Sequence, residues 1–229
     1  MPGKDCFLHF YSADTIYEYY CLLNIYDVIK ELGYREDYRG QEEPKSRLSY
    51  NYLPPNPWYE NTTEDNTFYF CKNEVKLTLY YTPVIYSRKS ITSNGITLFR
   101  TDEANQQGYQ TYYLPDFILK KESPQGISYG ILDAKWRPQN ILLGKSQEGG
   151  LRELSYKYIY SIVDAQTLKS VDFFWLLQGK YDGAQIYFHH NGMMSRNFDE
   201  KFRYQTGIVK VTPKTGDKDL ARVLGHFLN

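Results

Sequence analysis

The sequence predicts an α/β protein in which a mixed central β-sheet is flanked by helices. Three observations support this class. Apolar runs of strand length, rich in Val, Ile, Tyr and Phe, recur along the chain. Segments with helical spacing of apolar residues occur near both ends and after residue 150. Two apolar runs near the middle flank a turn, which predicts a β-hairpin. Interleaved strand and helix patterns are typical of a sheet with helices on its faces.

The composition sets limits on the class of protein. The 229 residues fit one large domain, or one domain with an added lobe. The 27 Lys and Arg residues balance the 27 Asp and Glu residues, so nucleic acid would have to be held by local basic patches. Cys6, Cys21 and Cys71 are widely spaced, which predicts free thiols in a reducing cytoplasm. The chain has no signal-peptide pattern and no apolar run of membrane length, so we expect a cytoplasmic protein without a membrane segment.

The first predicted helix covers residues 12 to about 32. Ser12 or Asp14 is a suitable N-cap, apolar residues follow at helical spacing, and Gly33 comes after the end. Glu18 interrupts the apolar surface of this helix. It is either a solvated glutamate stabilised by the helix dipole or an additional carboxylate for a metal site.

The next stretch, about residues 35–66, is polar and rich in proline, which predicts a loop or a small insertion. Together with the first helix it is expected to belong to an N-terminal extension, residues 1–72, that packs on the rest of the molecule. Residues 73–229 are then the core domain.

The core is expected to begin with a strand at Val75–Tyr86, in which Pro83 marks an edge, a bend or an end. A short strand should follow at Ile96–Phe99. The central hairpin comes next. Its two apolar runs, Tyr112–Leu119 and Ile127–Trp136, are separated by the turn sequence Ser-Pro-Gln-Gly.

This hairpin carries three charged side chains in apolar surroundings. Side chains alternate along a strand, so Asp133 and Lys135 point to one face and Ala134 to the other. Asp116 joins them if the hairpin register allows it. Charges in a half-buried cleft need partners or a metal. Two carboxylates with an open side suit Mg²⁺, and the lysine could orient a water or stabilise charge on a phosphate.

After the hairpin, residues 138–150 are expected to form a loop. Its Gly144-Lys145 pair lacks the spacing of a P-loop. Helical spacing then predicts a helix over Leu151–Lys169. The remaining predicted elements are strands at Phe173–Gln178, Ala184–His189 and Gly207–Thr212, and a terminal helix from Asp217 or Asp219 to Leu228.

The pair Pro115-Asp116, followed after an apolar strand and a turn by Asp133-Ala134-Lys135, resembles the signature of PD-(D/E)XK nucleases. The resemblance implies a restriction-endonuclease-like core with a mixed sheet. It also implies that Asp116, Asp133 and the Ala134 carbonyl hold Mg²⁺, with Mn²⁺ as an alternative. Lys135 would position the attacking water. The competing interpretation is a hairpin with an edge aspartate and a surface Asp–Lys pair.

Residues Ile16–Tyr20 and Ile29–Tyr34 are similar to the helix that precedes the nuclease core in McrC-like proteins. By that resemblance Glu18 joins the catalytic and metal-binding groups. Many PD-(D/E)XK enzymes also carry a Gln or Lys and a Tyr, four residues apart, on the helix after the DxK strand. Tyr156 and Tyr160 have this spacing, but Tyr156 departs from the pattern. Tyr160 and Lys157 are therefore candidates for auxiliary or DNA contacts.

The resemblance implies a metal-dependent DNA endonuclease of restriction or antiviral defence. Proteins of this branch often work beside an AAA+ NTPase, and since this chain has no Walker motif, such a motor would be a separate chain. The alternative is a catalytically inactive nuclease fold that binds nucleic acid or serves in assembly. RNA cleavage and homo-oligomer formation also stay open at this point.

Overall fold

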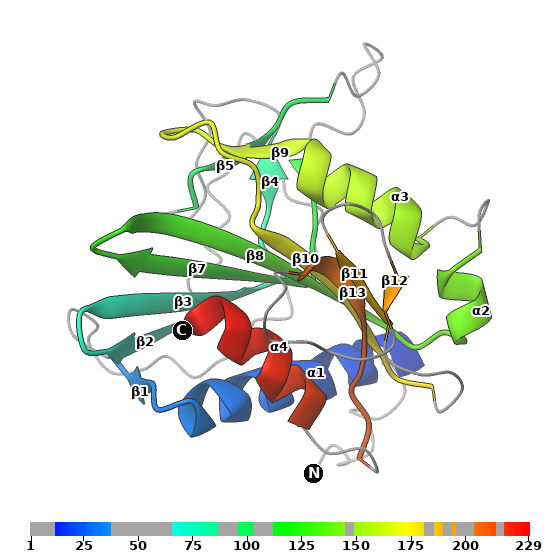
Figure 1. Cartoon of the computed structure of the whole chain (residues 1–229). Coiled ribbons are helices and arrows are strands. Elements are labelled where there is room, and N and C mark those ends of the chain that lie inside the picture. Colours follow the sequence, from blue (N-terminus) through cyan, green and yellow to red (C-terminus); the bar gives the residue numbers. More distant parts are fainter. Residues whose placement is uncertain are drawn as a thin grey trace, which may run out of the picture.

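The computed structural model describes residues 12–37, 66–86, 96–102, 112–144, 149–180, 186–189, 194–195, 204–213 and 218–229. Within these ranges a mixed sheet of nine strands forms the centre of the molecule, as predicted (Figure 1). Its strands lie in the order β1-β2-β3-β7-β8-β10-β13-β11-β12. Strand β10 is parallel to both of its neighbours, and the other pairs are antiparallel. The bounds are β1 Arg35–Glu36, β2 Thr67–Lys72, β3 Val75–Tyr81, β7 Phe117–Ser123, β8 Gly126–Lys135, β10 Phe173–Gln178, β11 Ile186–His189, β12 Met194–Ser195 and β13 Tyr204–Lys210.

The predicted central hairpin is confirmed as β7 and β8. The tight turn pairs Ser123 with Gly126, and the ladder continues to the pair Phe117 and Leu132. Gly126 has a φ of +124°, which favours glycine because a Cβ would be strained there. Strand β10 is fully buried, and it extends the sheet on the other side of β8. The hairpin therefore lies in the interior of the sheet.

One face of the sheet is covered by α1 (Ala13–Glu31) and α4 (Lys218–Leu228), both of which were predicted (Figure 1). The Ser12 side chain caps α1 by accepting from the Thr15 N–H, and Gly33 follows at a φ of +88°. Two buried tyrosines tie the ends of the chain together. The Tyr17 hydroxyl donates to the Val211 carbonyl at 3.1 Å, and the Tyr34 hydroxyl donates to the Leu228 carbonyl at 3.0 Å.

The other face carries α3 (Leu151–Ser155), the π-helical turn η2 (Tyr156–Tyr160) and two small antiparallel sheets. One small sheet pairs β4 (Ile85–Tyr86) with β6 (Tyr112–Tyr113), and the other pairs β5 (Leu98–Arg100) with β9 (Ile162–Asp164). Each face buries its own apolar cluster against the sheet. The structure is thus a sheet between two layers, as the interleaved pattern predicts.

The prediction of one helix over Leu151–Lys169 is wrong beyond Tyr160. The chain leaves the helix at Ser161, and β9 pairs with β5. The Asp164 carboxylate closes the next turn by accepting from the N–H and the hydroxyl of Thr167, at 2.8 and 2.7 Å. The β-branched Ile162 and Val163 suit a strand, but its main hydrogen-bond partner is the distant β5.

Three smaller predictions are also corrected. The strand expected at Val75–Tyr86 ends at Tyr81, since Thr82 has a φ of +49° and Pro83 has no N–H to donate. The loop expected at residues 138–150 contains the short helix α2 (Gln139–Leu142). The short strand expected at Ile96–Phe99 covers Leu98–Arg100.

The boundary expected after residue 72 falls inside the hairpin of β2 and β3. The first 72 residues therefore supply β1 and β2 to the central sheet as well as the helix that packs on it. Most of the loop expected at residues 35–66 lies outside the described residues, as does Cys6. Cys21 and Cys71 are free thiols, as expected. None of the helices in the described ranges has the length and apolar character that a membrane crossing requires.

Candidate active site

The register of the hairpin places Asp116 opposite Asp133. Phe117 pairs with Leu132, so the residue before β7 faces the residue after Leu132 on β8. The Asp116 Oδ2 accepts a hydrogen bond of 2.6 Å from the Ala134 N–H, which fixes the carboxylate against the strand. The register condition on which the predicted cluster depends is therefore met.

Lys135 completes this cluster. Its Nζ forms an ion pair with Asp133 Oδ1 and lies 3.9 Å from Asp116 Oδ2. The side chains are 4% exposed for Asp133, 15% for Asp116 and 23% for Lys135. The three charges thus converge at the end of the central hairpin, with the lysine as the most exposed member. Asp116, Asp133 and Lys135 are called the acid cluster from here on. A surface Asp–Lys pair would be far more open than this.

Burial and mutual proximity shift the pKa values of Asp116 and Lys135. Burial, reinforced by the nearby Asp133 charge, raises the pKa of Asp116, and Lys135 opposes the rise only in part. Burial also disfavours the charge on Lys135, but the two aspartates outweigh burial and raise the pKa of that ammonium. The cluster therefore contains more negative charge than one lysine balances, which favours the uptake of a proton or of another cation.

Glu18 lies on α1 and belongs to the electrostatic surroundings of the cluster. Burial raises its pKa, Lys135 lowers it, and Asp133 raises it. The Tyr81 hydroxyl donates to Glu18 Oε2 at 3.4 Å. The glutamate is half-buried, so of the two alternatives the structure favours a carboxylate beside the site over a fully solvated one.

Tyr158 is a further hydrogen-bonding partner of the acid cluster, and the sequence analysis did not identify it. Its hydroxyl donates to Asp133 Oδ2 at 3.2 Å, and the side chain is 1% exposed. Burial and the nearby Asp133 raise the pKa of Tyr158, so the hydroxyl keeps its proton and remains a donor. The available signal was its place on the apolar stripe of the predicted helix, because a buried tyrosine hydroxyl needs a polar partner.

The structure does not bring Tyr160 to the cluster. Tyr156 and Tyr160 are 69% and 68% exposed, and their ring centroids lie 5.9 Å apart on the outer side of η2. The spacing of four residues does place both rings together, but on the face opposite to the inward-pointing Tyr158. Tyr158, and not Tyr160, is therefore the tyrosine that contacts the acid cluster, and a contact of Tyr160 with DNA stays a prediction.

The residues present fit a Mg²⁺ site of limited ligand number. Among the described residues no group of three or more His, Cys, Asp and Glu side chains is close enough to hold a metal by itself. Mg²⁺ is commonly bound through one or two carboxylates, with waters and substrate phosphate completing its shell. Asp133 Oδ1 is buried, and among the described residues its contact is the ion pair with the Lys135 ammonium. The two carboxylates suit a divalent cation, provided that Lys135 gives way.

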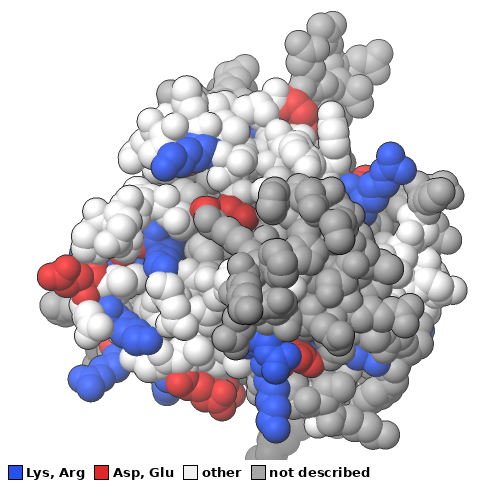
Figure 2. All heavy atoms as spheres, in the orientation of Figure 1, with Lys and Arg blue, Asp and Glu red and all other residues white. Residues whose placement is uncertain are grey.

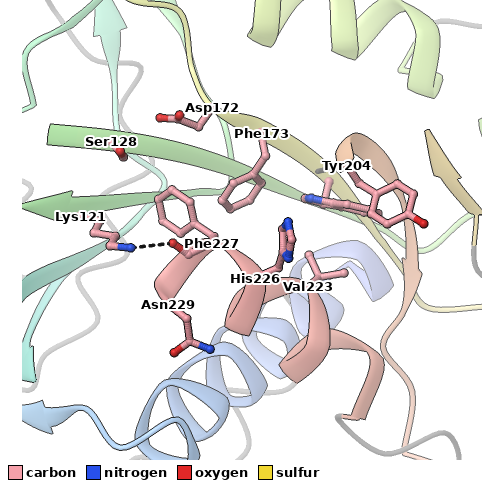
Figure 3. Close-up of a pocket in the computed structure, with 10 residues that line it drawn as sticks. Lys121, Ser128, Asp172, Phe173, Tyr204, Val223, His226, Phe227 and Asn229 are labelled. Carbon is pink, nitrogen blue, oxygen red and sulfur yellow. Dashed lines mark hydrogen bonds between the residues drawn. The ribbon is translucent and has the colours of Figure 1, made fainter. Parts of the chain in front are cut away.

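A separate hollow of about 280 Å³ lies beneath α4, on the opposite face of the sheet (Figure 3). It is lined by Lys121, Ser128, Asp172, Phe173, Trp175, Tyr204, Val223, His226, Phe227 and Asn229. The Lys121 ammonium donates to the Phe227 carbonyl at 2.9 Å, and the Asp172 carboxylate accepts from the Tyr129 N–H at 3.1 Å. These polar groups are engaged within the fold, so the hollow is a weaker candidate than the acid cluster.

The surface carries no extended field of one sign on the face shown in Figure 2, where Lys and Arg side chains are interspersed with Asp and Glu side chains among the described residues. Any polyanion would be held by local contacts.

Comparison with protein-family models, with curated proteins and with solved structures finds no match. The geometry of the chain itself is therefore the basis for a functional proposal.

Proposed function

We propose that this protein is a metal-dependent nuclease that hydrolyses phosphodiester bonds of DNA, similar to the McrC-like branch of PD-(D/E)XK nucleases. One observation carries the proposal: Asp116, Asp133 and Lys135 converge in a half-buried cluster at the end of the central hairpin. The order of elements around it agrees with the resemblance. In the central sheet and its helices, α1 comes first, then five antiparallel strands that end with the hairpin of β7 and β8, then a helical segment and the parallel strand β10.

The residues divide the work as follows. Asp116 and Asp133 would hold Mg²⁺ or Mn²⁺, with the Ala134 carbonyl and Glu18 as further oxygen donors. A bound metal would supply Lewis-acid stabilisation of a pentavalent phosphate and lower the pKa of a bound water. Lys135, the most accessible residue of the cluster, would orient the attacking water and stabilise negative charge on the phosphate. Tyr158 holds the Asp133 carboxylate in a fixed orientation.

The cellular setting follows from the same resemblance. We place the protein in the cytoplasm, in restriction or antiviral defence, where a separate AAA+ NTPase would deliver the DNA.

A second candidate is a non-catalytic nucleic-acid-binding or assembly subunit that keeps the nuclease fold. One observation favours it: the Lys135 ammonium already bridges both aspartates, so a metal must displace an internal cation. The zero net charge of the chain points the same way. The complete set of three charged residues favours the enzyme.

The test is cleavage of supercoiled plasmid by the purified chain with Mg²⁺ or Mn²⁺, beside EDTA. Asp133→Asn and Lys135→Gln should each slow nicking by about 100-fold or more, the range typical of lost acid–base or charge-stabilising groups. Lys76→Gln removes an exposed lysine at the far end of β3 and is the matched control. Cleavage by Asp133→Asn at the wild-type rate would show that the site is misassigned. Calorimetry with Mn²⁺ separates the candidates, since the binding subunit need not take up metal at this cluster.

A further inference from the structure

The half-buried cation Lys157 lies next to the acid cluster and has no carboxylate partner within ion-pair distance among the residues the structure describes. Its Nζ instead lies 4.5 Å from the ring centre of Tyr113 and 5.1 Å from that of Tyr158. The Tyr158 hydroxyl reaches Asp133 Oδ2 at 3.2 Å. One aromatic side chain therefore links the lysine to the acid cluster.

This arrangement has an energetic cost. Burial lowers the pKa of Lys157, and Lys135 lowers it further, while the Asp133 and Glu153 charges oppose the decrease only in part. Ring faces repay part of the cost of desolvating an ammonium, but less than an anion in direct contact would. Long charged side chains are seldom withdrawn from water without a partner. The Lys157 ammonium is therefore able to bind an anion from outside the chain.

Contacts with Arg100 and Asp102 hold the ring of Tyr113 in place. The Arg100 guanidinium lies 3.9 Å from the centre of this ring, and its Nε forms a 2.8 Å ion pair with Asp102. The Tyr113 hydroxyl donates to the same carboxylate. Asp102 thus neutralises Arg100 and anchors Tyr113, which leaves Lys157 as the cation of this group that is not ion-paired.

The local backbone presents Lys157 in this direction. Residues 156–160 form a π-helical turn, a rare feature that often occurs at functional sites. In this turn Tyr158 points inward to Asp133, while the exposed Tyr156 and Tyr160 point outward. Lys157, the residue before Tyr158, lies over the rings of Tyr113 and Tyr158 at the side of the acid cluster.

We infer that Lys157, seated on Tyr113 and Tyr158, is a subsite for an internal backbone phosphate of the nucleic acid, beside the phosphate that the acid cluster cleaves. This inference rests on the proposed function for the identity of the anion. Lys157 is a positioning residue, because it holds the strand and takes no part in bond breaking. A phosphodiester oxygen fits an ammonium of this kind, since the contact is a charge-assisted hydrogen bond.

The test measures binding without cleavage. Fluorescence anisotropy in EDTA follows a labelled DNA oligonucleotide, single-stranded or duplex, at several salt concentrations. Lys157→Gln should weaken binding by about tenfold at low salt, in line with a lost hydrogen bond between charged groups. It should also reduce the slope of log K against log salt by roughly 0.7–0.9, the value for one phosphate contact. Lys157→Arg should restore most of both.

Lys76→Gln, which removes a remote exposed lysine, is the control and should bind as the wild type does. Thermal melting of each variant excludes unfolding as the cause.

Oligonucleotides with and without a 5′-phosphate distinguish contact with an internal phosphate from contact with a terminal one. Weaker binding of both oligonucleotides by Lys157→Gln supports the subsite. Unchanged affinity and salt slope in Lys157→Gln overturns the inference, as does a loss confined to the 5′-phosphorylated strand. Since EDTA prevents cleavage, failure of the nuclease proposal in the plasmid assay is a separate result.

Discussion

The hydrogen bond from Tyr158 to Asp133 offers the sharpest test of the site geometry. Tyr158→Phe removes the hydroxyl and leaves a ring of nearly the same shape, packed 5.1 Å from Phe174 and 6.2 Å from Tyr113 between ring centres. The packing is therefore retained, while Asp133 Oδ2 loses its donor inside the protein.

The magnitude follows from the burial of both groups. A hydrogen bond to a charged group contributes roughly 1.5–3 kcal/mol, and water has little access to a side chain that is 1% exposed. We expect Tyr158→Phe to lower the free energy of unfolding by about 2 kcal/mol. For a chain of this size that corresponds to a decrease in Tm of roughly 4–8 °C.

Urea denaturation at pH 7, followed by circular dichroism, measures the change. Tyr160→Phe is the matched control, and because its ring is exposed its effect should stay within about 0.5 kcal/mol. A double-mutant cycle with Asp133→Asn should give a coupling energy of about 1 kcal/mol or more. Equal effects of the two tyrosine substitutions, or no coupling to Asp133, would refute the hydrogen bond as the link between η2 and the acid cluster.

Three further predictions follow from the same structure. The pKa of Asp116 is raised, so above about pH 4 the folded protein holds a proton that the unfolded chain has lost, and wild-type stability should fall as the pH rises. Asn at this position can still accept from the Ala134 N–H, so pH-dependent denaturation of Asp116→Asn should show this fall reduced or absent. Gly130→Ala would place a Cβ 2.1 Å from the Phe173 ring and should lower the free energy of unfolding by about 1–3 kcal/mol in urea denaturation. Gly225 lies inside α4, where an added Cβ meets no atom closer than 3.5 Å, so Gly225→Ala should raise the free energy of unfolding by roughly 0.5–1 kcal/mol. A Gly130→Ala variant as stable as the wild type would contradict the close packing. Mn²⁺ should raise the Tm of the wild type but not that of Asp133→Asn, and an equal shift in both proteins would place the ion elsewhere.

Local sequence features predicted the central part of the site. The turn after β7 fixes the hairpin, and the alternation of side chains along β8 then places Asp133 and Lys135 on one face. Once the register is set by that turn, Asp116 can only lie opposite Asp133. These inferences hold because every step depends on residues close together in the chain.

The segment after residue 150 shows where such reasoning fails. Helical spacing correctly predicts the start at Leu151, but it cannot show that Ile162 pairs with a strand more than 60 residues earlier. Nor can it show the π-helical turn at Tyr156–Tyr160, in which Tyr158 turns inward. The spacing of Tyr156 and Tyr160 therefore does not single out Tyr158, the tyrosine that contacts Asp133.

The sequence by itself determined the α/β class, the helices at both ends, the central hairpin and the common face of Asp133 and Lys135, while the place of Asp116 depended on the hairpin register. Periodicity, turns and caps are properties of neighbouring residues, and these features depend on nothing else. Only the tertiary structure decided that Glu18 on α1 lies in the field of the cluster, that Tyr158 supports Asp133, and that Lys157 rests on Tyr113. Those contacts join segments far apart in the chain, and they form because two apolar layers must close on opposite faces of one sheet.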